Sequence, residues 1–140
     1  MPPLRRYYGF ISHAWTYNED YYRLVDMLDK ANNFDFHNYS VPEHDPLTPR
    51  TLKQLGSALE NQMRLAQVVL VIAGMYVAYS EWIDFEIAYA VRTRKPIVGI
   101  QPRGAEVTPR AVSQNAKTMV GWNTDSTVSA IRAYALQPSR

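Results

Sequence analysis

The sequence contains no cysteine, which excludes a disulfide framework, a thiolate zinc site and a cysteine nucleophile. It also lacks a long hydrophobic run: the longest apolar stretch, residues 68–73, is far too short to span a bilayer, and no apolar leader follows the first arginines. Charge of one sign is scarce, because 15 Lys and Arg residues are scattered among 13 Asp and Glu residues. These absences predict a cytoplasmic protein that neither crosses a membrane nor binds nucleic acid.

Several nucleotide- and metal-dependent chemistries are also missing their motifs. There is no GxGxxG and no GxxxxGK[ST], so no glycine-rich loop is available to cradle a phosphate. A phospho-accepting receiver domain needs acidic residues where this chain has Ser12, His13 and Gly74. The three histidines (His13, His37 and His44) lie in separate segments, which argues against a metal site, and no GxSxG elbow supports a serine hydrolase.

The composition that remains is that of one globular domain covering residues 1–140, with 46% hydrophobic and 20% charged residues. Short β-branched and aromatic runs alternate with stretches of helical period, which predicts parallel strands joined by crossover helices. The predicted strands are residues 7–11, 34–37, 68–73, 97–100 and 118–121. The second and last of these are the weakest, so we expect them near the edges of the sheet.

About four helices are predicted between the strands, from near residue 18, over residues 48–63, from residue 80 to a stop before Pro96, and over residues 127–135. The third helix should bury a stripe formed by Ile83, Ile87, Ala90 and Val91. Together these elements predict an α/β fold: a flavodoxin-like open five-stranded parallel sheet with helices on both faces. In such folds ligands bind at the carboxyl ends of the strands.

The third predicted helix carries the best candidate for chemistry, Glu86. On a helix that starts at Ser80, Glu86 lies four residues after Trp82 and borders the buried stripe, so we expect a partly buried carboxylate. Two interpretations remain open at this point. The carboxylate belongs to a site, or it is an ordinary helical glutamate that is solvated or ion-paired.

Other polar and aromatic residues at the predicted strand ends are candidates of lower rank. Asn38 and Ser40 could be turn residues that lead to Pro42, and His13 could hydrogen-bond the backbone at the end of a strand. Trp82 could be a core anchor, or its indole could stack on a nicotinamide or adenine ring. Each of them therefore has a structural interpretation beside the functional one.

Five segments of this chain, taken in order, resemble the motifs of one family. They read Y-G-F-I-S-H-A at residues 8–14, N-Y-S-V-P at 38–42, V-L-V-I-A-G at 69–74, S-E-W-I-D-F-E-I at 80–87 and K-P-I-V-G-I at 95–100. The sequence is similar to the TIR-like domains that include the NAD-processing subunit of Thoeris anti-phage defence. The W-x-x-x-E on a helix after an apolar strand, joined to an opening F-I-S, carries the resemblance.

The resemblance implies that Glu86 is catalytic, because the W-x-x-x-E glutamate of enzymatic TIR domains is required for cleaving the nicotinamide–ribose bond of NAD+. It implies NAD+ as substrate, with no cofactor and no metal. Their expected places at the strand ends and beside Glu86 predict that Phe10, Ser12, His13, Asn38, Ser40 and Trp82 form the substrate pocket. The chain departs from many eukaryotic TIR domains after its F-I-S strand and in the loop after the second strand, which favours a bacterial TIR-like branch.

The resemblance further implies a cyclic or conjugated ADP-ribose product that signals to a separate effector, and self-association through TIR surfaces. Two rival functions stay open. The first is a non-catalytic TIR module that works by assembly with other TIR domains. The second is an enzyme like the nucleoside deoxyribosyltransferases, in which a glutamate attacks the sugar and bases are exchanged.

Overall fold

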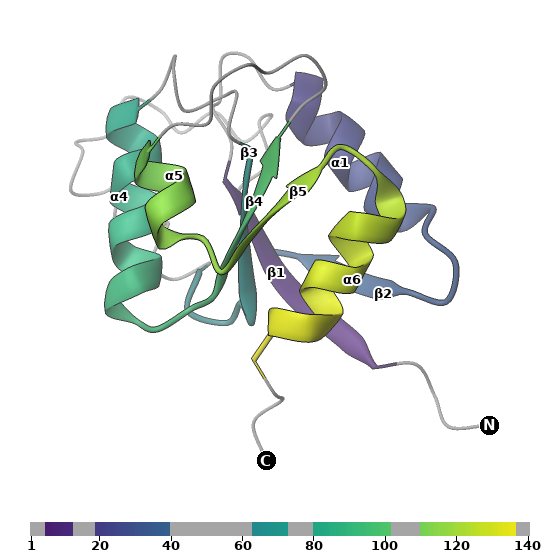
Figure 1. The fold of residues 1–140 in the computed structure, drawn as a ribbon. Helices are drawn as coiled ribbons and strands as arrows, with labels where there is room; N and C mark the ends of the chain where they lie inside the picture. Colours follow the sequence, from purple (N-terminus) through teal and green to yellow (C-terminus); the bar gives the residue numbers. More distant parts are fainter. Residues whose placement is uncertain (1–4, 13–18, 40–62, 73–79, 102–109, 137–140) are drawn as a thin grey trace, which may run out of the picture.

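The computed structural model describes residues 5–12, 19–39, 63–72, 80–101 and 110–136, which form a parallel sheet with helices beside it (Figure 1). In chain order the elements are β1 (Arg6–Ser12), α1 (Glu19–Asp29), β2 (Asp35–Asn38), β3 (Val68–Ile72), α4 (Ser80–Arg92), β4 (Ile97–Gln101), α5 (Arg110–Asn115), β5 (Thr118–Gly121) and α6 (Thr124–Tyr134). All five predicted strands are confirmed. The helix predicted over residues 48–63 lies, except for buried Met63, outside the described residues.

The five strands are all parallel and lie in the order β2-β1-β3-β4-β5. The weak strands β2 and β5 occupy the two edges, as their sequences predicted. The central strand β3 is buried at all five positions, which explains its unbroken run of valine, leucine and isoleucine. The strand order reverses between β1 and β3, so the topological switch point of this fold lies at the carboxyl ends of those two strands.

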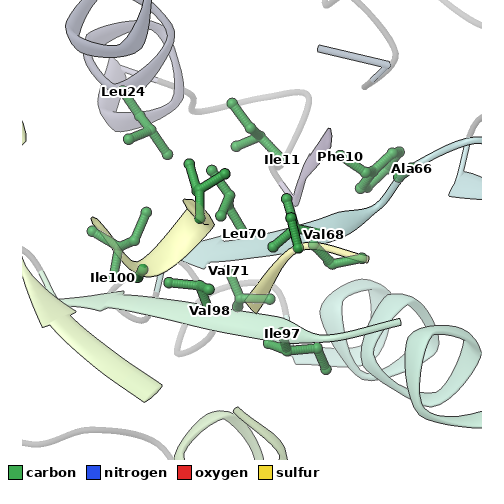
Figure 2. Close-up of a cluster of buried hydrophobic side chains, with 14 of the residues drawn as sticks. Phe10, Ile11, Leu24, Ala66, Val68, Leu70, Val71, Ile97, Val98 and Ile100 are labelled. Atoms are coloured by element: carbon green, nitrogen blue, oxygen red, sulfur yellow. The ribbon is translucent and has the colours of Figure 1, made fainter. Parts of the chain in front are cut away.

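Helices cover both faces of the sheet, which confirms the predicted layers. Helices α1 and α6 lie on one face and α4 and α5 on the other (Figure 1). The hydrophobic core fills the space between these layers and the sheet. Figure 2 shows side chains of β1, β3 and β4 in this core together with Leu24 of α1.

Three details differ from the prediction. Helix α5 was not predicted, because its six residues are too few to show a helical period. Helix α6 begins at Thr124, three residues earlier than predicted, because Asn123 caps it. The prediction that Val91 is buried was wrong: its side chain is 50% exposed, since it lies about 140° around the helix from the centre of the buried face at Glu86.

Candidate active site

Helix α4 supplies the central residue of the candidate site. The segment has neither glycine nor proline, and its end is closed by a hydrogen bond from the backbone N–H of Lys95 to the carbonyl oxygen of Ala90. Arg94 adopts the left-handed conformation (φ 60°) that commonly terminates a helix, and Pro96 follows. These features give α4 a defined carboxyl end.

Within α4, Glu86 faces the interior of the protein. Its relative exposure is 0%, and Ala90, one turn later on the same side of the helix, is also fully buried. The neighbouring Ile87 is 4% exposed. The carboxyl group is thus more deeply buried than the sequence predicted, and the interpretation of Glu86 as a solvated surface residue is wrong.

The strand register shows which sheet residues face the same layer. Gly99 of β4 faces α5, because a side chain added there would meet Val112 of that helix. Gly99 pairs with Val71 of β3, and Val69, two residues earlier on the same face, pairs with Phe10 of β1. Phe10, which is 1% exposed, therefore lies in the same layer as the buried carboxyl group of α4.

Asn38 does not share that face. It is half-buried and pairs with Gly9, whose direction alternates with that of Phe10 along β1. Its side chain therefore belongs to the face covered by α1 and α6. The structure consequently brings Phe10 and Glu86 to one side of the sheet and places Asn38 at the edge strand on the other side.

Of the four other predicted site residues, two are placed by their backbone alone and two lie outside the described residues. Ser12 is the last residue of β1 and Trp82 lies on α4 one turn before Glu86, but their side chains lie outside the described residues. His13 and Ser40 lie outside the described residues altogether. The substrate-binding roles of all four stay predictions.

An aromatic cluster that the sequence analysis did not single out lies on the α4 side of β1 and β2. The ring of Tyr39 stacks on Tyr8 at 5.6 Å and lies 4.7 Å from the His37 ring, and its backbone N–H continues the sheet by donating to the carbonyl oxygen of Gly9. The sequence signal that could have revealed this cluster is the spacing of two residues between Tyr8 and Phe10 and between His37 and Tyr39, since alternate residues of a strand lie on one face. Tyr39 is half-buried and extends the aromatic surface on which Phe10 lies.

The described residues contain neither a metal-binding cluster nor a membrane-spanning helix. No group of three or more His, Cys, Asp or Glu residues in this part of the chain could hold a metal ion. No helix among the described residues is long and apolar enough to cross a membrane. The buried carboxylate of α4 remains the principal chemical feature of the site.

A parallel five-stranded sheet of this order, with a carboxylate on the helix after its central strand, defines a flavodoxin-like α/β domain of the TIR-like class. The family model described as Thoeris protein ThsB, TIR-like domain, matches residues 10–107, which is more than half of the chain. The chain belongs to this family, and the membership gives it a TIR-domain role in anti-phage defence. No curated protein and no solved structure matches the chain.

Proposed function

We propose that this chain cleaves the bond between nicotinamide and ribose in NAD+, with Glu86 as the catalytic carboxylate. The observation that carries the proposal is the complete burial of Glu86 on the helix that follows the central strand. Membership of a TIR-like family supports it, since some TIR domains cleave NAD+.

Burial of an acidic side chain needs a reason, because removing a carboxylate from water is costly. Among the described residues, only Glu86 and Thr127 are buried polar residues. The hydroxyl of Thr127 donates a hydrogen bond to the carbonyl oxygen of Asn123 at 2.8 Å, so its burial is explained by the start of α6. Glu86 is thus the only buried acidic or basic side chain in the described part, and such groups concentrate at functional sites.

A carboxylate suits this reaction. When the bond between the ribose carbon and nicotinamide breaks, its electron pair moves to the pyridinium nitrogen, and nicotinamide leaves as a neutral molecule. The ribosyl group then carries oxocarbenium character, which a nearby carboxylate stabilises electrostatically in a site that excludes water. Attack by water completes hydrolysis with release of a proton, whereas attack by a group of the same nucleotide completes cyclisation.

The structure also constrains how substrate would reach the carboxylate. Because no surface of Glu86 is accessible to solvent, NAD+ binding requires side chains that cover it to move. Phe10 faces the same layer, and Tyr39 extends the aromatic surface toward β2. We expect these rings to contribute apolar contacts to a planar base rather than hydrogen bonds to phosphate.

The test compares the wild-type chain with Glu86→Gln, which keeps the shape of the side chain and removes its charge. Purified protein, and lysate of phage-infected cells that express it, are incubated with NAD+, and nicotinamide and ADP-ribose products are followed by mass spectrometry. We expect the wild type to release nicotinamide and Glu86→Gln to lose at least a hundredfold in rate, the size expected when a group that stabilises developing charge is removed.

Asp29→Asn provides the matched control, because Asp29 is an exposed acidic residue at the end of α1, on the opposite face of the sheet. Circular dichroism and thermal unfolding confirm that both variants fold. If NAD+ stays intact in both preparations, or if Glu86→Gln is as active as the wild type, the catalytic assignment fails and a non-catalytic assembly module becomes the better function. Base exchange on deoxynucleosides without NAD+ consumption would instead identify the deoxyribosyltransferase-like alternative.

The downstream part of the proposal concerns the product. We propose that it is a cyclic or conjugated ADP-ribose, which leaves the cytoplasmic enzyme and activates a separate effector. The product mass distinguishes the cases, since linear ADP-ribose contains one water molecule more than its cyclic form. Detection of linear ADP-ribose alone would contradict the proposed signal without contradicting NAD+ cleavage.

A further inference from the structure

The positive charges of this chain are scattered along the sequence, but the fold gathers several of them at one end of the sheet. Arg64 lies in the turn before β3, and Lys117 lies directly before β5. Arg94 and Lys95 lie between α4 and β4. Because β3, β4 and β5 are parallel neighbours, their starts lie side by side, about 4.8 Å from one strand to the next. We refer to these four residues as the basic end of the domain.

Hydrogen bonds hold the turns of the basic end against one another. The ammonium group of Lys95 donates to the carbonyl oxygen of Arg64 at 2.8 Å, which joins the turn before β4 to the turn before β3. The backbone N–H of Lys117 donates to the carbonyl oxygen of Ile97 at 2.7 Å, which joins the start of β5 to the start of β4. The four cations are therefore carried on one connected framework.

No carboxylate of the described chain balances this charge. Arg64, Arg94 and Lys117 are exposed, and none of them forms an ion pair within the described residues. Ion pairs lie instead beside β1 and β2, in the other half of the sheet: Arg6 with Asp35, and Lys30 with Asp26. The basic end thus concentrates like charges, which an anionic partner would relieve.

Local structure explains only part of the charge. Lys95 binds two backbone carbonyl oxygens, and Arg92 in the last turn of α4 already complements the helix dipole. Arg94 has no such role. Its N–H bonds the carbonyl of Val91 while that of Lys95 bonds the carbonyl of Ala90, an arrangement in which glycine is preferred at position 94.

Arginine at position 94 is conformationally unfavourable. Its φ of 60° is left-handed, a region in which the Cβ atom of any residue but glycine is crowded. An exposed arginine therefore occupies a position where glycine would make the fold more stable. This cost indicates a use for the charge of Arg94 outside the folded chain itself.

Apolar surface accompanies the cations. Leu65 follows Arg64 in the same turn and is 53% exposed. Leu136 is also exposed, and its backbone N–H donates to the carbonyl oxygen of Gln67 at 3.0 Å, so it lies beside that turn. A partner of the basic end therefore meets aliphatic side chains as well as positive charge, and this decides among anionic partners.

We propose that the basic end is a docking surface for an acidic segment of a different protein, rich in Asp and Glu and carrying aliphatic side chains. The guanidinium groups of Arg64 and Arg94 suit carboxylates, which they can bind through two parallel hydrogen bonds. Leu65 offers an apolar contact between them and the partner. The segment supplies the negative charge that the described chain lacks at this end.

Two other anionic partners fit less well. A nucleic-acid backbone presents charge without aliphatic groups, and a formal net charge of +2 gives it little long-range attraction. An anionic bilayer attracts a few exposed cations only weakly and reversibly when no lipid chain or amphipathic helix adds to them. The combination of arginines and leucines favours protein.

The proposed partner and the substrate would use opposite ends of the domain. The basic end lies where the strands begin, whereas ligands of this fold class bind at the carboxyl ends of the strands. The inference therefore does not depend on NAD+ cleavage. It can be tested in the absence of nucleotide.

Fluorescence anisotropy of the full chain with a labelled peptide of sequence EDELEELDE measures the interaction. We expect saturable binding in the micromolar range at low salt, weakened at least tenfold at about 0.5 M salt because exposed charges are screened. The uncharged peptide QNQLQQLNQ, which keeps the leucines, should not bind. Single-stranded DNA, duplex DNA and phosphatidylserine vesicles are titrated in parallel.

Variants locate the binding surface. Arg94→Gln and Lys117→Gln should each weaken peptide binding about fivefold or more, because each removes one cation that faces the partner. Arg110→Gln is the matched control, since Arg110 is an exposed arginine at the start of α5, at the opposite end of the sheet, and its loss changes the net charge equally. It should leave binding unchanged.

Arg94→Gly separates binding from folding. Glycine suits the left-handed backbone, so this variant should raise the urea concentration at the midpoint of unfolding while it weakens peptide binding as much as Arg94→Gln does. A structural role for the Arg94 side chain predicts the reverse, with lower stability and unchanged binding.

Absence of saturable peptide binding overturns the proposal, and so do equal effects of Arg94→Gln and Arg110→Gln. Tighter binding of DNA or of phosphatidylserine vesicles than of the peptide also overturns it and assigns the basic end to that partner. Peptide binding as described in protein that cleaves no NAD+ would support this inference while contradicting the proposed function, so the two can fail separately.

Discussion

Lys95 connects the turn before β4 to the turn before β3, at the end of the sheet where the strands begin. Its ammonium group donates hydrogen bonds to the carbonyl oxygens of Arg64 at 2.8 Å and Ala66 at 2.6 Å, in the segment that leads into β3. Its own backbone N–H closes the end of α4 on Ala90. One half-buried lysine thus fixes the end of the helix that carries Glu86 relative to the start of the central strand.

We expect Lys95→Met to lower the free energy of unfolding by about 1–2 kcal/mol, because the aliphatic stem is kept while two hydrogen bonds to backbone carbonyls are lost. Denaturation by urea measures the change. Arg94→Met, at the neighbouring exposed position, is the control and should change stability by less than about 0.5 kcal/mol. A variant as stable as the wild type would show that water replaces the lysine at both carbonyls.

Lys95 should also make the free energy of unfolding depend on pH. Burial disfavours the ammonium form and lowers the pKa of Lys95 below its ordinary value of 10.5. The neutral amine still has two N–H donors for the two carbonyl oxygens, so both forms can keep these hydrogen bonds. Burial therefore decides the direction in which the pKa shifts. Between the folded pKa and 10.5 the unfolded chain binds more protons than the folded chain, and the folded state therefore gains stability as pH rises through this interval.

The measurement is the difference in unfolding free energy between the wild type and Lys95→Met at several pH values from 7 to 10.5. We expect this difference to increase toward the upper end of the range. Other groups that titrate there are common to both proteins and cancel. A difference that decreases with rising pH would mean that the folded protein raises the pKa of Lys95 instead.

Among the elements, α6 shows its start signal most clearly. The side chain of Asn123 accepts a hydrogen bond from the backbone N–H of Ser126 at 2.8 Å, and the backbone of Asn123 is extended, as an N-cap requires. Helix α6 buries Val128 and Ile131 against the sheet, so a correct start sets the register of this buried face. The cap explains why the helix begins before its hydrophobic period becomes visible.

We expect Asn123→Ala to lower the free energy of unfolding by about 1 kcal/mol, because the N–H of Ser126 loses its partner. Asn123→Ser keeps an oxygen that can accept the same bond and should retain most of the stability. Thermal unfolding of the three proteins gives the comparison. Equal loss in both variants would assign the effect to some other contact of Asn123.

At the scale of the whole molecule, Gly9 is one of the small residues that allow side chains of neighbouring strands to approach closely. A side chain at Gly9 of β1 would come within 2.4 Å of the ring of Phe36 on β2 and 3.3 Å of Val68 on β3. Phe36 is itself stacked against Phe34 at 6.0 Å, so its ring cannot retreat without disturbing that contact. Gly9 therefore allows the edge strand to pack against the layer of α1 and α6.

We expect Gly9→Ala to lower the free energy of unfolding by about 1–3 kcal/mol through overpacking. Gly9→Ala with Phe36→Leu should recover part of this loss, because leucine vacates the space that the new methyl group needs. Gly121→Ala is the control, since its nearest neighbouring atom lies 3.8 Å away. If Gly9→Ala is no more harmful than Gly121→Ala, the ring of Phe36 moves at little cost.

The ends of the described chain are also joined at this scale. The guanidinium of Arg5 lies 4.3 Å from the centre of the Tyr7 ring, which stacks on Phe34 at 5.4 Å, and Arg132 of α6 lies over the other ring of this pair at 5.5 Å. Arg132 also donates a hydrogen bond to the carbonyl oxygen of Asn33. The first strand and the last helix are thus connected through one stacked series, while a single domain over residues 1–140 stays a prediction.

The sequence alone determined the strand positions, the parallel fold class and the family, because these depend on local signals. The apolar run of β3 and the stop at Pro96 are readable without knowledge of any neighbour. The choice of Glu86 as the candidate residue also came from the sequence, from its place in W-x-x-x-E on a predicted helix.

Only the tertiary structure decided which surfaces meet. Glu86 is fully buried and Val91 is exposed because the direction in which α4 faces depends on packing against other elements, among them α5, which lies later in the chain. Asn38 falls on the opposite face from Phe10 because strand register, not residue type, assigns a side chain to a face. Short local patterns fix what each element is, but packing between elements distant in sequence fixes where each side chain points.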